Sequence, residues 1–438
     1  MKTTTRIRTA LALALVLPAL ALAVPPGGEG GPMEKGLAAY EAGDYATALE
    51  LWRPLASQGD PEAQFRLGYL YAMGQGVPQD QGLALTWYRK AAELGHAKAQ
   101  FNLGVAYLKG NGVDKDPETG FTWVQRSAVQ GWAPAQYVLG SLFGQGLGTE
   151  KDLAQAAHWM MEAADQGHAD AQYALARMYL EGAGDEKDTA RAVELLREAG
   201  KNGSLEAIYT LGVINPARGM EPDSPEAVAK IRKAAELGYP QAQYDLGAAY
   251  ASGTGGLEKD AAEAAVWFEK AAGKGLAQAQ YDLGWLYENR EGVEKNEEKA
   301  VEWYTKAADQ GFARAQYQLG LHFASGRGVE KDANKGFELV IEAADAGFVE
   351  AQYAVGVMYD EGNGVQQDYS KAMEWYKKAA ANGNATAMFA AGNLYSNGYG
   401  VAKDSKEAKK WYCKAARLGL PQGKKMLGDD VDVDEVCK

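Results

Sequence analysis

Apolar positions in this chain follow a helical period, and the pattern as a whole returns every 35 to 37 residues. The stretch 303–320 reads WYTKAADQGFARAQYQLG, and close copies lie at 87–104 and 375–392. The anchor of each copy is an alanine, usually followed by glutamine: Ala63, Ala99, Ala135, Ala171, Ala207, Ala242, Ala279, Ala315, Ala351 and Ala387. A fixed period over most of a chain predicts an array of stacked repeats.

Each copy contains two segments with helical periodicity. Ala63, Leu67 and Tyr71 fall at i, i+4 and i+8, so they lie on one face of a first helix. A Gly-rich turn follows, and then an acidic residue such as Asp80 that is suited to cap a second helix. The tryptophans that recur in the second helix are interpreted as core residues: Trp87, Trp123, Trp159, Trp267, Trp303, Trp375 and Trp411.

Most first helices also contain an interior glycine, such as Gly284. A glycine inside a helix costs about 1 kcal/mol relative to alanine, so its recurrence needs a packing reason. We expect a neighbouring helix to approach so closely at this point that a Cβ atom would clash.

These positions resemble the Sel1-like repeat, a relative of the tetratricopeptide repeat, with the pattern AxxxLGxxYxxGxGVxxDxxKAxxWYxKAAxxGxxxAQ. In one copy the matching residues are Ala279, Leu283, Gly284, Tyr287, Gly292, Val293, Ala300, Trp303, Tyr304, Ala307 and Ala308. The resemblance covers roughly residues 60–428. It implies an all-α fold, a right-handed α-solenoid superhelix of about ten stacked helix-turn-helix repeats with capping helices at both ends.

Differences among the copies suggest how the chain is organised. We expect residues 24–32 to be a linker, 33–59 a tetratricopeptide-like capping hairpin, 60–203 a first run of repeats, 204–238 a divergent repeat, 239–419 a second run, and 420–438 a capping helix with an acidic tail tethered by a disulfide.

The divergent repeat replaces residues that other copies share. Ile208 stands where most copies have glutamine, and Ile231 and Arg232 replace the Trp-Tyr pair. We interpret the region 195–231 as a weaker stacking interface that acts as a hinge. The alternative is a longer loop with the stacking intact.

The first residues have the form of a secretory signal peptide. A basic start with Lys2, Arg6 and Arg8 precedes a short apolar run and small residues up to Ala23. The run is shorter than the roughly 20 residues of a membrane span, so we expect cleavage after Ala23, no integral membrane span, and a periplasmic or secreted protein. An uncleaved anchor is the alternative.

The net charge limits the classes of binding partner, and the cysteine content bears on the cellular compartment. Without those three basic residues the chain has 42 basic and 58 acidic residues, a net charge of −16, which disfavours nucleic acid and anionic membranes. Cys413 and Cys437 are the only cysteines. In an exported chain they are expected to form a disulfide, worth about 3 kcal/mol, with two free thiols as the alternative.

No pattern of catalytic or cofactor-binding residues stands out. The four histidines, His96, His158, His168 and His322, form no metal-ligand motif. No phosphate-binding glycine loop and no common serine-nucleophile motif occurs. We therefore expect no metal, no cofactor and no enzymatic activity.

The positions three and six residues after each anchor alanine vary among the copies. In an α-solenoid the first helices line the concave groove, so these positions are candidates for partner binding. Asp245, Asp282, Trp285 and Gln318 combine one aromatic residue with an acidic rim, which suits a basic or mixed protein or peptide surface. The alternative is that they only fill the groove by local packing.

The resemblance implies a protein-binding adaptor of the bacterial envelope. Two alternatives also follow from it. Some periplasmic Sel1-like proteins are immunity proteins against secreted lipase-type effectors, and one Sel1-like protein binds a host protein, secretory immunoglobulin A.

Overall fold

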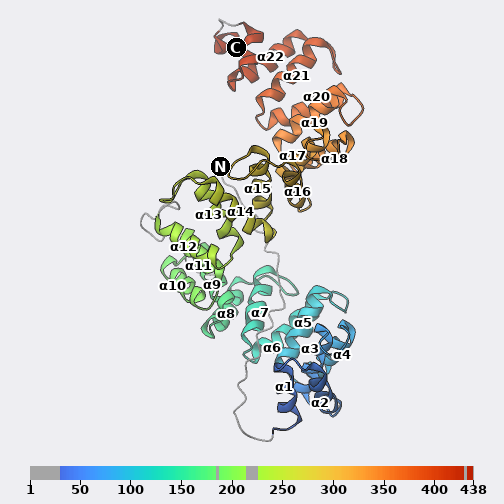
Figure 1. Ribbon diagram of the computed structural model, residues 1–438, viewed down its shortest axis with the longest axis vertical. Coiled ribbons are helices and arrows are strands. Elements are labelled where there is room, and N and C mark those ends of the chain that lie inside the picture. The colour runs from blue at the N-terminus through green and yellow to red at the C-terminus, as the bar shows by residue number, and fades with distance from the viewer. Residues whose placement is uncertain (1–29, 184–186, 214–224, 429–431, 438) are drawn as a thin grey trace. The chain divides into compact units, whose positions relative to one another are not determined.

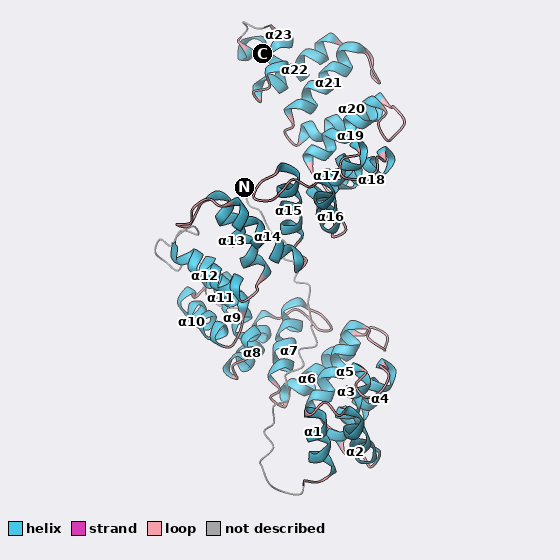
Figure 2. Ribbon diagram, viewed as in Figure 1, coloured by secondary structure: helices cyan, strands magenta, loops and turns pink. Residues whose placement is uncertain are grey.

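The computed structural model describes residues 30–183, 187–213, 225–428 and 432–437. In these ranges the chain forms helices and no strands (Figure 2). The expected signal peptide, 1–23, lies outside the described residues. The chain divides into two compact units, Met1–Lys187 and Asp188–Lys438.

Unit 1 consists of consecutive antiparallel helices (Figure 1). They are α1 Pro32–Glu41, α2 Tyr45–Ser57, α3 Pro61–Met73, α4 Gln81–Glu93, α5 Ala97–Lys109, α6 Pro117–Val129, α7 Ala133–Gln145, α8 Leu153–Asp165 and α9 Ala169–Glu181. The odd-numbered helices are the first helices of the repeats, and the even-numbered helices are the second helices.

Unit 2 continues the same alternation. Its helices are α10 Thr189–Lys201, α11 Leu205–Val213, α12 Pro225–Glu236, α13 Pro240–Ser252, α14 Ala261–Gly273, α15 Ala277–Asn289, α16 Glu297–Ala308, α17 Ala313–Ser325, α18 Ala333–Asp345, α19 Val349–Glu361, α20 Tyr369–Ala381, α21 Ala385–Asn397, α22 Ser405–Arg417, α23 Pro421–Leu427 and α24 Val433–Val436. The predicted all-α solenoid of about ten repeated hairpins is confirmed.

The N-caps of the second helices lie where the sequence places them. In α16, for example, the Asn296 side chain accepts a hydrogen bond from the backbone N–H of Lys299 at 2.9 Å. Aspartates do the same at the other repeats: Asp80, Asp116, Asp152, Asp188, Asp260, Asp332, Asp368 and Asp404. Each cap satisfies an N–H group that the helix itself cannot bond.

The interior glycine of the first helix packs closely against the second helix of its own hairpin, in several repeats against an aromatic ring. A Cβ atom added to Gly284 would lie 2.8 Å from the Tyr304 ring, and one added to Gly356 would lie 2.5 Å from the Tyr376 ring. Real Cβ atoms do not approach other atoms this closely. The predicted close approach is therefore confirmed, and its partner is a residue of the second helix, a tyrosine at Gly284 and Gly356 and a valine at Gly320.

The neighbouring glutamine joins three helices. Gln280 in α15 is buried, and its side-chain amide donates to the backbone oxygen of Ala272 in α14 at 3.1 Å. Its Oε1 accepts a hydrogen bond at 2.7 Å from Gln310, which lies just after α16. The same arrangement joins Gln100 to Gln130, Gln136 to Gln166 and Gln352 to Asn382. One glutamine side chain therefore connects its own first helix to the second helix before it and to the end of the second helix after it.

Apolar packing continues through the described part of the divergent repeat. Val228 and Ile231 of α12 share one cluster with Leu246 of α13 and Trp267 of α14, and Ile208 of α11 packs against it. Residues 214–224, including the turn with several prolines, lie outside the described residues. The hinge expected at 195–231 stays a prediction.

We expect Gly284→Ala to lower the free energy of unfolding. Forcing a methyl group against the Tyr304 ring costs about 1 to 3 kcal/mol, which outweighs the gain in helix propensity of about 1 kcal/mol. Gly273→Ala is the control, because Gly273 is the last residue of helix α14 in the same unit and a Cβ there meets no atom within 4 Å. Urea unfolding followed by circular dichroism should move the two midpoints in opposite directions, and equal shifts would contradict the packing explanation.

We expect Gln280→Leu to destabilise unit 2 by about 2 kcal/mol. The change removes two hydrogen bonds, each worth about 1 kcal/mol. The Ala272 oxygen keeps the N–H of Gly275 and the Gln310 amide keeps the Lys306 oxygen, so neither group is left without a partner. A double-mutant cycle with Gln310→Ala, again by urea unfolding, should reveal coupling between the two residues. Strict additivity would mean that their hydrogen bond contributes nothing to stability.

Candidate binding surface

Trp285 on α15 is the most conspicuous departure from the repeat. Its side chain is 38% exposed, and no other tryptophan ranks among the exposed large apolar residues of the described chain. It lies at the sixth position after the anchor Ala279. The same position holds Ala248 in α13 and Leu321 in α17, both half-buried.

The other nine tryptophans, all within the described residues, have ring partners. Eight have a lysine or arginine over the ring: Trp52, Trp87, Trp123, Trp132, Trp267, Trp303, Trp375 and Trp411. The ninth, Trp159, contacts the His158 ring. The recurring second-helix tryptophans are members of the apolar clusters or pack against them, so their interpretation as core residues is confirmed. Trp285 differs from all of them.

The two predicted aspartates bond to tyrosines of the preceding first helix. The Tyr209 hydroxyl in α11 donates to Asp245 Oδ2 at 2.6 Å, and the Tyr244 hydroxyl in α13 donates to Asp282 Oδ2 at 2.7 Å. Adjacent first helices of unit 2 are therefore linked by a ladder of tyrosine–carboxylate hydrogen bonds.

Gln318 on α17 continues this ladder. It hydrogen-bonds the hydroxyl of Tyr281 on α15. The structure therefore places all four predicted residues along one face of α13, α15 and α17, and gives three of them a structural partner as well. The role of these residues in binding stays a prediction. Sequence reasoning missed these tyrosines. The sequence does contain a signal for them, since tyrosine often follows the Ala-Gln pair.

The Asp282 carboxylate is partly desolvated. Burial raises the pKa of Asp282, while the hydrogen bond from Tyr244 and the nearby positive charge of Arg314 act in the opposite direction. Burial also raises the pKa of the Tyr244 hydroxyl, and its hydrogen bond to Asp282 raises it further. Tyr244 therefore remains a donor at neutral pH and fixes the orientation of the carboxylate.

Glu288, one turn after Trp285, is held by a polar cluster. It accepts hydrogen bonds from the Tyr304 hydroxyl and from Arg327, each at 2.9 Å. The Nε2 atom of the fully buried His322 lies 3.5 Å from Glu288 Oε1. His322, Tyr304 and Arg327 together lower the pKa of Glu288 to about 2, although burial opposes them. Sequence reasoning missed this cluster. Its histidine replaces an apolar residue of other copies, while the position of Glu288 is also acidic at Asp360, which accepts a hydrogen bond from Tyr376 at 3.0 Å.

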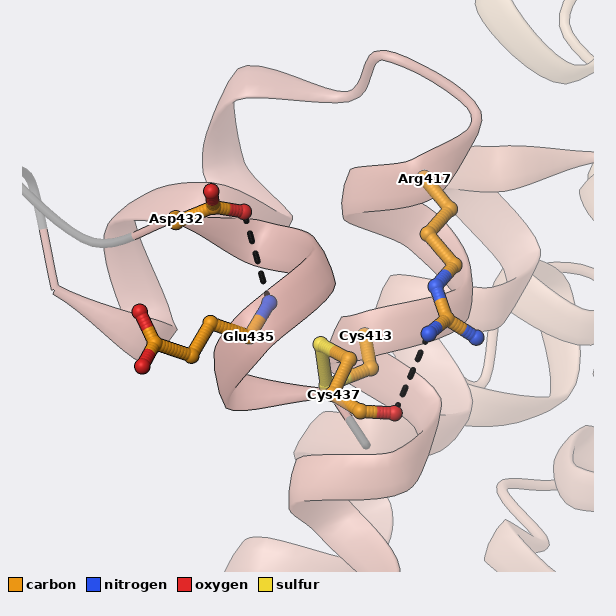
Figure 3. The surroundings of a disulfide bond; sticks show 5 residues. All are labelled: Cys413, Arg417, Asp432, Glu435 and Cys437. Carbon is orange, nitrogen blue, oxygen red and sulfur yellow. Dashed lines mark hydrogen bonds between the residues drawn. A yellow bond between two sulfur atoms is a disulfide. The ribbon is translucent and has the colours of Figure 1, made fainter.

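A disulfide bond ties the end of the chain to the last complete hairpin. Cys413 in α22 and Cys437, just after α24, are joined with their Cα atoms 5.6 Å apart (Figure 3). The Arg417 guanidinium donates to the backbone oxygen of Cys437 at 3.1 Å. The bond closes a segment of 24 residues, which is worth about 3 kcal/mol in the loop-entropy treatment.

Other kinds of site have no counterpart in the described ranges. Three or more His, Cys, Asp or Glu side chains do not gather anywhere in these ranges in a way that could hold a metal ion. A search of the same residues for a helix with the length and apolar character of a membrane span finds none.

The family profile identifies the repeats directly. The Sel1 repeat profile matches residues 31–60, 61–96, 97–132, 133–168, 169–204, 240–276, 277–312, 313–348, 349–384 and 385–420. The chain therefore belongs to the Sel1 repeat family. The profile also matches 31–60, for which we expected a tetratricopeptide-like hairpin, and leaves 205–239 in the divergent repeat unmatched.

Solved structures agree with this assignment. A protective antigen of uropathogenic Escherichia coli with an SLR fold is 33% identical, with a TM-score of 0.62, and the match covers 87% of this chain and 82% of that one. A Sel1 repeat protein from Oxalobacter formigenes is 35% identical, with a TM-score of 0.52, covering 55% of this chain and 99% of that one.

An immunity protein of Pseudomonas aeruginosa is 25% identical over 49% of this chain and 81% of that one, but its TM-score of 0.32 carries no functional argument. The comparison with curated proteins gives no match. Sel1 repeat proteins typically act as scaffolds for protein interactions, and their fold is generally non-catalytic.

We expect Glu288→Gln to destabilise unit 2 by about 1 to 3 kcal/mol at pH 7, because Arg327 and Tyr304 lose a charged acceptor. A carboxyl group with a lowered pKa contributes stability above its ordinary pKa of 4.5, and the contribution is lost as the pH falls through about 2. The difference from the unmodified protein should therefore shrink as the pH falls below 4.5. Urea unfolding over this pH range tests it, with the exposed Glu302 of α16 changed to Gln as control. A pH-independent difference would contradict the ionic explanation.

Proposed function

We propose that this protein is a non-enzymatic adaptor of the bacterial periplasm or cell surface that binds a partner protein or peptide. The binding surface is the face of α13, α15 and α17 that carries Asp245, Asp282, Trp285 and Gln318, called the first-helix face below. The observation that carries the proposal is the exposed indole of Trp285, against which no cation and no other ring lies in the described part of the chain.

An exposed tryptophan of this kind suits a binding surface. Tryptophan is enriched among the residues that dominate binding energy at protein interfaces, because one rigid ring buries a large area. The half-buried Leu321 and Ala248 extend the apolar surface into the neighbouring repeats. The hydrogen-bonded Asp245, Asp282 and Gln318 form a polar border along one side, as in interfaces with an apolar centre and a polar rim.

The exported location is supported by two independent features of the chain. The basic start with Lys2, Arg6 and Arg8 and the apolar run up to Ala23 have the form of a cleaved signal peptide. The Cys413–Cys437 disulfide is a bond that persists in oxidising compartments and is rare in the cytosol of most bacteria.

A surface-exposed or secreted form that binds a host protein is the second candidate. The similar protein is described as a protective antigen present in uropathogenic Escherichia coli strains, and this description supports the candidate. Secretory immunoglobulin A is the host partner that the family resemblance suggests. A periplasmic immunity protein against a lipase-type effector is the third candidate, and it rests on the family resemblance.

We expect affinity capture to depend on Trp285. The chain beginning at Val24, with its disulfide intact, is immobilised and exposed separately to envelope extract and to host secretions that contain secretory immunoglobulin A. The affinity of a Trp285→Ala variant for the specific partner should fall at least about tenfold, because residues of this type often contribute more than 1.4 kcal/mol to binding. Mass spectrometry quantifies the loss, and binding is then reconstituted with the purified partner.

The matched control is Val266→Ala, which removes an exposed apolar side chain from the second helix α14 of the same unit. Retention by this variant together with loss by Trp285→Ala supports the first-helix face, and the source of the partner separates the envelope role from the host role. Equal capture of every protein by both variants would refute the proposed site.

A further inference from the structure

We propose that Trp285 binds a lysine or arginine side chain of the partner, with Asp282 as the counter-ion. The partner would thus present an extended segment with two basic residues three positions apart. This inference rests on the proposed function and specifies the chemistry of its partner.

Most tryptophans of this chain have a lysine or arginine side chain over the indole ring. In six repeats a lysine or arginine three residues later lies over the indole, for instance Lys306 over Trp303 at 3.8 Å and Lys378 over Trp375 at 3.6 Å. The other four members of the set are Lys90, Arg126, Lys270 and Lys414. A cation over an indole face is a favourable electrostatic contact, so the pairing recurs for a physical reason.

Trp285 has acidic residues where a cation would be needed. Glu288 stands three residues after it and Asp282 three residues before it. Arg327 pairs with Glu288. Arg314 lies near enough for its charge to act on Asp282, but within the described residues no ion pair joins the two side chains. No cation lies over the Trp285 ring in the described part of the chain, so its helix prepares a site for a cation that it does not supply.

The Asp282 carboxylate is prepared to receive that cation. Tyr244 donates to Oδ2, and the Gln278 side chain donates to the Tyr244 hydroxyl at 2.6 Å, which holds the carboxylate in place. Within the described residues, no hydrogen bond to Oδ1 occurs. A guanidinium over the indole one helical turn away could donate to this oxygen while its face contacts the ring.

The repeat spacing sets the pattern of the ligand. Tyr244 on α13 reaches Asp282 on α15 directly, so the two first helices are neighbours, and packed helices lie about 8 to 10 Å apart. A chain in the polyproline II conformation advances about 3.1 Å per residue and returns to the same face every third residue, so one repeat corresponds to about three residues. A second basic residue three positions away would therefore meet Asp245 on α13.

The test uses a defined peptide and the full chain from Val24 with its disulfide intact. All tryptophans are labelled with 5-fluorotryptophan, and Trp285→Phe assigns the Trp285 fluorine signal. The probe is the acetylated, amidated peptide Gly-Arg-Ala-Ala-Arg-Gly. Its control replaces both arginines by citrulline, which keeps the shape and removes the charge. The signal of Trp303, which Lys306 already covers, is the internal control.

We expect the arginine peptide to shift the Trp285 signal and leave the Trp303 signal in place. Asp282→Asn should weaken binding about threefold or more, and higher salt should weaken it further. An unmoved Trp285 signal, or an equal shift with the citrulline peptide, would overturn the inference. If the captured partner needs Trp285 but is indifferent to Asp282→Asn and to salt, the adaptor function stands and only the cation is wrong. If no partner needs Trp285, the proposed function fails as well.

Discussion

The solenoid depends on burial that no hairpin can achieve alone. Each helix pair leaves one apolar face open, and only the next repeat can cover it. The buried glutamine after the anchor alanine fixes the position of the next repeat on this apolar face. Gln280 bonds backward to α14 and forward to the end of α16, so α15 is held by the second helices on both sides, and Gln100, Gln136 and Gln352 hold their helices in the same way. Because an unsatisfied buried amide is costly, this clamp favours one register of stacking.

The other shared positions adjust the packing around that clamp. Gly284 lets the Tyr304 ring lie directly on the helix backbone, so the two helices of a hairpin come close together. A cap at the start of each second helix, such as Asn296, satisfies the N–H groups left open by the turn. The scaffold can be repeated because all these contacts lie within one repeat or between neighbours.

Several residues differ from the repeat pattern, and they lie close together in the structure. In α15 and α17 the departures cluster, with an exposed tryptophan at position 285, a half-buried carboxylate at position 288 and a buried histidine at position 322. The Glu288 cluster satisfies its own charge internally, because Arg327 and Tyr304 both bond the carboxylate. Among the described residues no cation and no other ring lies against Trp285, and this difference separates a structural departure from a candidate binding position.

The sequence by itself determined the all-α class, the repeat, the second-helix caps and the close contact at Gly284. These features are local or periodic, so spacing along the chain reveals them. The tertiary structure alone decided which side chain each residue meets. Asp245 and Asp282 look like a free acidic rim in the sequence, but tyrosines one repeat away bond both of them. Contacts between residues more than 30 positions apart depend on how the helices are rotated and stacked, and the periodicity of a single helix does not contain that information.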